Sequence, residues 1–151
     1  IDGDVWLEER NGGRTAADIA DEHGIEALHA MEAEVALDAL ALPEPAVIGP
    51  AASVIEHEGV RSALAGHAVV WLWATAEYLA GHAVKKTHRP LLDGGDPVDL
   101  FRRQLAVREP LVLALDPLVV DVVNQNKAQE VAMIVEYARR VTSASSPPPS
   151  S

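Results

Sequence analysis

The 151-residue sequence contains no cysteine. Disulfide bridges and zinc–thiolate sites are therefore excluded, and the composition is compatible with the reducing cytosol, so we expect a cytoplasmic protein. The sequence also lacks a signal peptide and any apolar run of about 18 residues, the length that a membrane-spanning helix needs. We therefore expect no association with a membrane.

Basic and aromatic residues are scarce as well. Lys and Arg number 12 against 23 Asp and Glu, which gives a net charge of −11. This balance argues against a nucleic-acid partner, which would require a basic surface, and against an anionic membrane surface. With a single Phe in the chain, the core must consist mainly of Ala, Val and Leu, and the length suits one domain.

Hydrophobic patterning predicts helices that alternate with strands. The run at 68–74 shows no polar alternation, which is typical of a strand buried on both faces of a parallel sheet, and 117–124 is expected to be another buried strand. A short apolar run between prolines predicts a further strand at 46–49. Thr15 and Asp18 have the spacing of a capping box at the start of a helix, and Pro110 should break a helix that begins near residue 97. We therefore expect an α/β three-layer sandwich with a parallel sheet over residues 1–142. A disordered Ser/Pro tail should follow at 143–151.

Cationic side chains gather in the second half of this acidic chain: Lys85, Lys86, His88, Arg89, Arg102, Arg103 and Arg108. One interpretation is a solvated loop followed by a charged helix face. The other is an anion clamp, because arginine suits bidentate contacts with carboxylates and phosphates. The six histidines have no metal-binding spacing, so a histidine metal cage is not expected.

Several stretches, taken in order, resemble the shikimate kinase family: "DGDVWLEERNGGRTAADI", "GVRSALAGHAVVWL", "HRPLLDGGDP" and "LAVREPL". The resemblance extends from residue 1 to about residue 141. It implies the P-loop kinase fold, which is similar to that of nucleoside monophosphate kinases. It also implies transfer of the γ-phosphoryl group of ATP to the 3-hydroxyl of shikimate.

The resemblance also implies roles for individual residues. Asp2 is similar to the aspartate near Mg²⁺, and Asp4 to the catalytic aspartate that holds the accepting hydroxyl. Arg89 is similar to a catalytic lid arginine that meets the transferring phosphate, and Arg108 to an arginine that binds the substrate carboxylate. An active protein would thus use ATP, Mg²⁺ and a small anionic hydroxy acid such as shikimate. Phosphoryl transfer depends mainly on positioning the reactants and neutralising the charge of the phosphate groups.

Four features depart from the family pattern. The sequence contains no Gly-x-x-x-x-Gly-Lys-Ser/Thr phosphate-binding loop. Pro50, Ala51 and Ala52 replace a triple-glycine turn, which places Ala51 at the substrate. His29 replaces a second carboxylate-binding arginine, a loss of about 2–3 kcal/mol or roughly a hundredfold in affinity. His82 replaces an arginine that packs on adenine, and so becomes the candidate nucleotide-binding residue.

These departures leave three hypotheses. The sequence favours a non-catalytic relative that acts as a binding or regulatory module. The alternative is an active shikimate kinase whose P-loop strand precedes residue 1 and is absent from this chain, which the lack of an initiator Met favours. The third is a structural protein that has kept only the fold and binds a protein partner.

Overall fold

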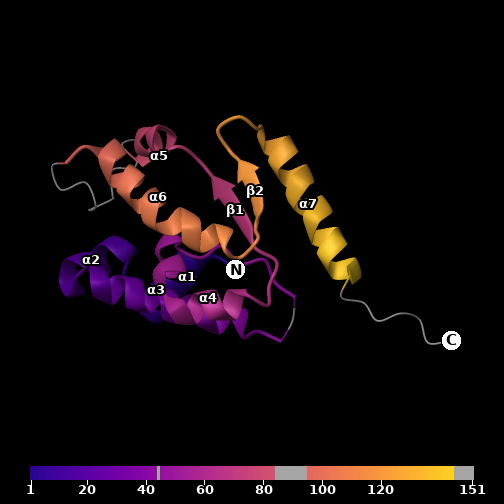
Figure 1. Cartoon of the computed structure of the whole chain (residues 1–151). Coiled ribbons are helices and arrows are strands. Elements are labelled where there is room, and N and C mark those ends of the chain that lie inside the picture. Colours follow the sequence, from indigo (N-terminus) through magenta and orange to yellow (C-terminus); the bar gives the residue numbers. More distant parts are fainter. Residues whose placement is uncertain (44, 84–94, 145–151) are drawn as a thin grey trace.

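The structure, a computed structural model, describes residues 1–43, 45–83 and 95–144. Helices and short parallel strands alternate in the second half of the chain, whereas the first half is helical (Figure 1). In chain order the elements are α1 (Gly3–Arg10), α2 (Ala16–His23), α3 (Ile25–Leu40), η1 (Ala52–Glu56), α4 (Glu58–Leu64), β1 (Val70–Trp73), α5 (Ala76–Ala83), α6 (Pro97–Leu113), β2 (Leu118–Asp121) and α7 (Lys127–Ala144), where η1 is a 3₁₀ helix.

Side-chain caps define where the first two helices begin. The Asp2 carboxylate accepts hydrogen bonds from the backbone N–H groups of Asp4 and Val5 and so caps α1. Thr15 and Asp18 form the predicted capping box at the start of α2. Gly24 then separates α2 from α3 at a φ of 86°, a conformation that favours glycine.

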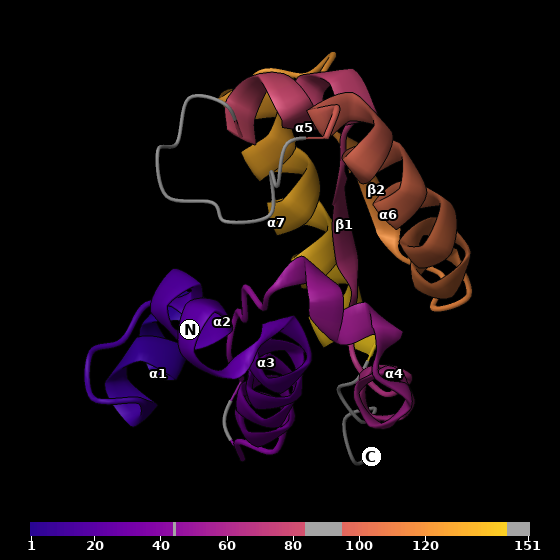
Figure 2. The same cartoon turned by 90° about the vertical axis from the view of Figure 1, so that its left-hand side faces the viewer.

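Helix α3 lies at the centre of the N-terminal half and contacts α1, α2, η1 and α4 (Figure 2). One core cluster joins it to α1 and α2, through Leu7, Ile19, Leu28 and Val35. A second cluster joins it to η1 and α4, through Ala33, Ala36, Val54 and Val60. As the composition predicted, both clusters consist almost entirely of small and medium aliphatic side chains.

The sheet of the C-terminal half is parallel, as expected. Strand β1 pairs with β2 in a register that runs from Val70 opposite Leu118 to Trp73 opposite Asp121. Helix α7 contacts β2, while α5 and α6 pack together on the opposite side of the sheet (Figures 1 and 2). This three-layer arrangement confirms the predicted α/β class.

Two expectations for the strands were wrong. No strand forms at 46–49, where only an isolated parallel bridge joins Gly49 to Asp2. Pro45 and Pro50 flank this stretch, and proline has no N–H to donate to a strand ladder. Strand β1 is not buried on both faces either, since Leu72 is 56% exposed. A sheet of two strands offers few neighbours to cover its side chains.

Two helix boundaries also differ from expectation. Helix α6 continues through Pro110 to Leu113, and the Ala114 N–H still bonds to the Pro110 carbonyl at 3.2 Å. Only one turn follows this proline, so the interruption removes a single intrahelical hydrogen bond near the end of the helix. Helix α7 ends at Ala144, past the expected boundary at 142, and residues 145–151 lie outside the described residues.

Across the described ranges, no helix combines the length and the apolar character that a membrane span requires.

Candidate functional site

Backbone contacts fix the start of the chain against the loop that leads to η1. The Gly3 N–H donates to the Gly49 carbonyl at 3.0 Å, and the Gly49 N–H donates to the Ile1 carbonyl at 2.9 Å. A Cβ atom on Gly3 would lie 3.1 Å from the Gly49 oxygen, so glycine permits this close approach. The pairing holds Asp4 beside the loop that contains Ala51.

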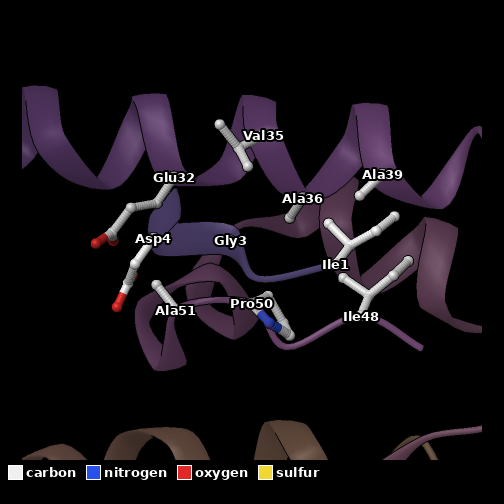
Figure 3. Close-up of a pocket in the computed structure, with 10 residues that line it drawn as sticks. All are labelled: Ile1, Gly3, Asp4, Glu32, Val35, Ala36, Ala39, Ile48, Pro50 and Ala51. Atoms are coloured by element: carbon white, nitrogen blue, oxygen red, sulfur yellow. The ribbon is translucent and has the colours of Figure 1, made fainter. Parts of the chain in front are cut away.

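A pocket opens between this pairing and helix α3 (Figure 3). Its inner part is apolar and is lined by Ile1, Val35, Ala36, Ala39, Ile48 and Pro50. Asp4, Glu32 and Ala51 lie at its other end, where both carboxylates point to the same side (Figure 3). The cavity volume is about 10 Å³, roughly the space of one water molecule. The polar groups of the pocket, Asp4 and Glu32, therefore lie at its mouth and not in the enclosed interior.

Glu32 is the centre of the polar mouth. Its carboxylate accepts a short hydrogen bond from the buried hydroxyl group of Ser53 in η1. Burial raises the pKa of Glu32 above its ordinary value of 4.5, against the lowering effect of the Ser53 hydrogen bond. His29, Asp4 and Arg108 lie close enough to influence this pKa as well: His29 and Arg108 lower it, and Asp4 raises it.

Arg108 reaches the site from α6. Its Nε donates to the Glu56 carboxylate at 2.6 Å, and its Nη1 donates to Gln104 Oε1 at 3.3 Å. Arg61 of α4 supports the other side of η1 by donating to the carbonyls of Ile55 and Glu56 at 2.8 and 2.7 Å. The 3₁₀ helix therefore lies between two arginines and carries Ser53 and Glu56 toward α3 and α6.

The structure thus brings together four residues that the sequence singled out. Asp4, His29 and Arg108 lie near enough to the Glu32 carboxylate for their charges to act on its pKa, and Ala51 lines the same pocket as Asp4 and Glu32. Their roles in binding and catalysis stay predictions. Sequence reasoning missed Glu32 itself, because a glutamate off the apolar stripe of α3 normally faces solvent. Its position three residues after His29 places both on one helix face, which was the available signal.

Asp2 fits a metal ion only in part. One of its carboxylate oxygens already caps α1, which leaves the other without a bond in the hydrogen bonds described. Across residues 1–43, 45–83 and 95–144, no three acidic or histidine side chains gather in a way that could hold a metal. Mg²⁺ usually binds one or two carboxylates and completes its octahedral shell with water and phosphate. Asp2 is compatible with that mode, but these residues build no protein cage.

The remaining two candidates are His82 and Arg89. His82 is in α5, where its ring stacks on Tyr78 at 4.2 Å and its Nδ1 lies 3.0 Å from the Tyr78 carbonyl. It does not contact the Glu32 cluster, and its proposed contact with a nucleotide stays a prediction. Arg89, with the neighbouring cations Lys85, Lys86 and His88, lies outside the described residues.

Comparisons with known proteins show similarity over most of the chain. The family model described as "Shikimate kinase" matches residues 1–139. The chain is 34% identical over 135 residues to the shikimate kinase of Mycobacterium tuberculosis and 35% identical over 135 residues to that of Thermobifida fusca. Both alignments cover 89% of this chain and 76% of the relative.

A solved structure, the shikimate kinase from Acinetobacter baumannii in complex with shikimate, has a similar fold. It superposes with a TM-score of 0.76 at 23% identity, over 93% of this chain and 78% of that chain. This likeness supports the α/β architecture, while the sequence matches establish the relationship. The chain belongs to the shikimate kinase family.

Proposed function

We propose that this protein is an active shikimate kinase, the alternative that the sequence left open, and not a non-catalytic relative. The observation that carries the proposal is the convergence of Asp4, His29 and Arg108 on one polar cluster. These residues come from α1, α3 and α6, which are far apart in the sequence. The relatives of about one third identity carry the name of the enzyme, and this also supports catalysis.

Each residue of the cluster has a chemical task in this proposal. Asp4 is exposed and lies at the mouth of the pocket, so its carboxylate accepts a hydrogen bond from a substrate hydroxyl and can take its proton. Arg108, which is 17% exposed, offers a largely desolvated guanidinium to the substrate carboxylate. His29 contributes a weaker contact at the carboxylate end, because its side chain is shorter than that of arginine and cannot make arginine's bidentate contact.

Charge on the phosphoryl group requires neutralisation during transfer. Mg²⁺ supplies that neutralisation when it is bound with the nucleotide, and Asp2 is the residue that would hold it. The role of Arg89 as a second cation for the phosphate belongs to the same proposal. The remaining contribution of the chain is to hold the acceptor hydroxyl next to Asp4.

The non-catalytic hypothesis retains one structural observation in its favour. Pro50 and Ala51 narrow the pocket where the family pattern has glycine, and the cavity inside has room for little more than one water molecule. This narrowing concerns the apolar interior, whereas Asp4 and Glu32 lie at the open end. It therefore restricts how deeply a ligand enters without removing the polar groups that would bind it.

Turnover by the complete gene product separates these hypotheses. ADP release in the presence of ATP, Mg²⁺ and shikimate should depend on shikimate. Asp4→Asn should lower kcat by about a hundredfold or more, since it removes the proton acceptor. The matched control is Asp21→Asn, an exposed acidic residue of α2. A folded protein without shikimate-dependent ADP release would overturn the proposal.

A further inference from the structure

The Arg108 guanidinium already has a carboxylate partner within its own chain. Its Nε donates to Glu56 Oε1 at 2.6 Å, a distance typical of charge-assisted hydrogen bonds. Its Nη1 donates to Gln104, which leaves Nη2 without a partner among the contacts of the described residues. A guanidinium binds a carboxylate in bidentate fashion either through Nε and Nη2 or through Nη1 and Nη2. In each of these pairs, one nitrogen of Arg108 already donates a hydrogen bond within the chain.

The charge around Arg108 strengthens this conclusion. Glu32, Asp4 and Glu56 place three carboxyl groups around the site, against the permanently charged guanidinium of Arg108. An anionic ligand that approaches the mouth of the pocket meets an arginine whose charge is already balanced. The approach is also opposed by the neighbouring acidic groups.

The 3₁₀ helix holds Glu56 in position for this contact. The Glu56 carbonyl accepts a hydrogen bond from Arg61 at 2.7 Å, and Ser53 of the same helix is anchored to Glu32. The backbone at Glu56 is therefore fixed on two sides, while its side chain remains 42% exposed. An exposed side chain on a fixed backbone can leave Arg108 without unfolding its surroundings.

We propose that Glu56 is a specificity-determining residue that competes with the ligand carboxylate for Arg108. This inference rests on the proposed function, in which Arg108 binds the carboxylate of a hydroxy acid. Binding of that acid displaces the Glu56 side chain toward solvent, and the cost of this exchange lowers affinity for carboxylates in general. The difference in affinity between the acid and an uncharged analogue is therefore smaller than it would be if Arg108 had no partner within the chain.

The test compares Glu56→Gln with Glu58→Gln, which removes an equal charge from an exposed position at the start of α4. Glutamine keeps the size of Glu56 and can still accept one hydrogen bond from Arg108, so the fold should be retained, which thermal unfolding checks. Calorimetry with shikimate should give a Kd about tenfold lower for Glu56→Gln than for the native protein. The Kd of shikimate methyl ester should change less than twofold, and Glu58→Gln should leave both unchanged.

A second probe separates the failure of this inference from the failure of the proposed function. Benzoate, a simple carboxylate, is titrated while the Arg108 Nε–H resonance is followed by NMR. If shikimate binds to no variant but benzoate shifts this resonance at tenfold lower concentration in Glu56→Gln, the competition stands and the proposed substrate is wrong. Equal or weaker binding of both carboxylates by Glu56→Gln would overturn the inference.

Discussion

The Ser53 hydroxyl donates a hydrogen bond to the Glu32 carboxylate, joining η1 to α3 across 21 residues of sequence. This pair sits at the mouth of the pocket, where Glu32 is partly withdrawn from water. A carboxyl group in that position binds a proton more readily in the folded chain than in the unfolded chain. The stability of the protein should therefore depend on the ionisation of Glu32.

The first prediction concerns that dependence on pH. Because the pKa of Glu32 is raised above 4.5 by burial, its contribution to stability is fully present below the unfolded value and is lost as pH rises through the folded pKa. Glu32→Gln does not titrate, so its free energy of unfolding should rise relative to the native protein over that range. Urea unfolding at several pH values above 4.5 measures the difference.

The control for this prediction is Glu26→Gln, an exposed residue on the same helix. Its pH profile should run parallel to that of the native protein. A parallel profile for Glu32→Gln as well would show that the ionisation of Glu32 is not linked to folding.

His29→Arg should strengthen the binding of carboxylate ligands. Arginine supplies a permanent charge and a bidentate donor pair, so the Kd for shikimate should fall by about tenfold to a hundredfold. Calorimetry near pH 7.5 provides the measurement. His23→Arg, at the exposed end of α2, adds the same charge away from the cluster. If both variants gave the same Kd, the effect would come from net charge alone.

Two Gly→Ala substitutions should change stability in opposite directions. Gly3→Ala places a methyl group 3.1 Å from the Gly49 oxygen and 3.2 Å from Pro50 Cα, so it should lower the free energy of unfolding by about 1–3 kcal/mol. Gly81→Ala lies within α5 with no atom within 4 Å of the new methyl, so it should raise that free energy by about 0.5–1 kcal/mol. Denaturant unfolding of both variants measures the contrast, and a neutral Gly3→Ala would contradict the tight pairing with Gly49.

Two prolines of α6 offer a further comparison. Pro110→Ala restores an N–H inside the helix, so it should raise the free energy of unfolding by about 1–3 kcal/mol. Pro97 occupies the first turn, where a proline replaces an N–H that has no intrahelical partner. Pro97→Ala should therefore have little effect. A loss of stability in Pro110→Ala, measured by denaturant unfolding, would show that the helix depends on the proline ring.

Short sequence patterns predicted the parts of the fold that are determined by residues close together in the chain. The capping box follows from Thr15 and Asp18, three residues apart, and strands β1 and β2 lie within stretches rich in apolar residues. The expected strand at 46–49 failed because a strand needs a partner along its whole length, and Asp2 provides only a single bridge to Gly49. Strand formation at that stretch is thus decided by pairing, which sequence patterns do not encode.

The site was predictable only where the family resemblance marked a residue. Asp4, His29 and Arg108 were found in that way, and the structure brings them together. Glu56 carries no local signal, and the signal for Glu32 is only its spacing of three residues from His29, because acidic residues on helices usually face solvent. Their contacts with Ser53 and Arg108 span 21 and 52 residues, so they exist only once α3, η1 and α6 have packed.

The short helix η1 has a mechanical consequence for this enzyme family member. Ser53 ties one side of it to α3, and Glu56 ties the other side to α6. A rotation that moves α6 away from α3 must stretch this five-residue segment or break one of the two side-chain links. Because Glu56 is the more exposed of the two, its link should yield first, and η1 should travel with α3. Among the side-chain hydrogen bonds of the described residues, the one from Arg108 to Glu56 is the link that joins η1 to α6.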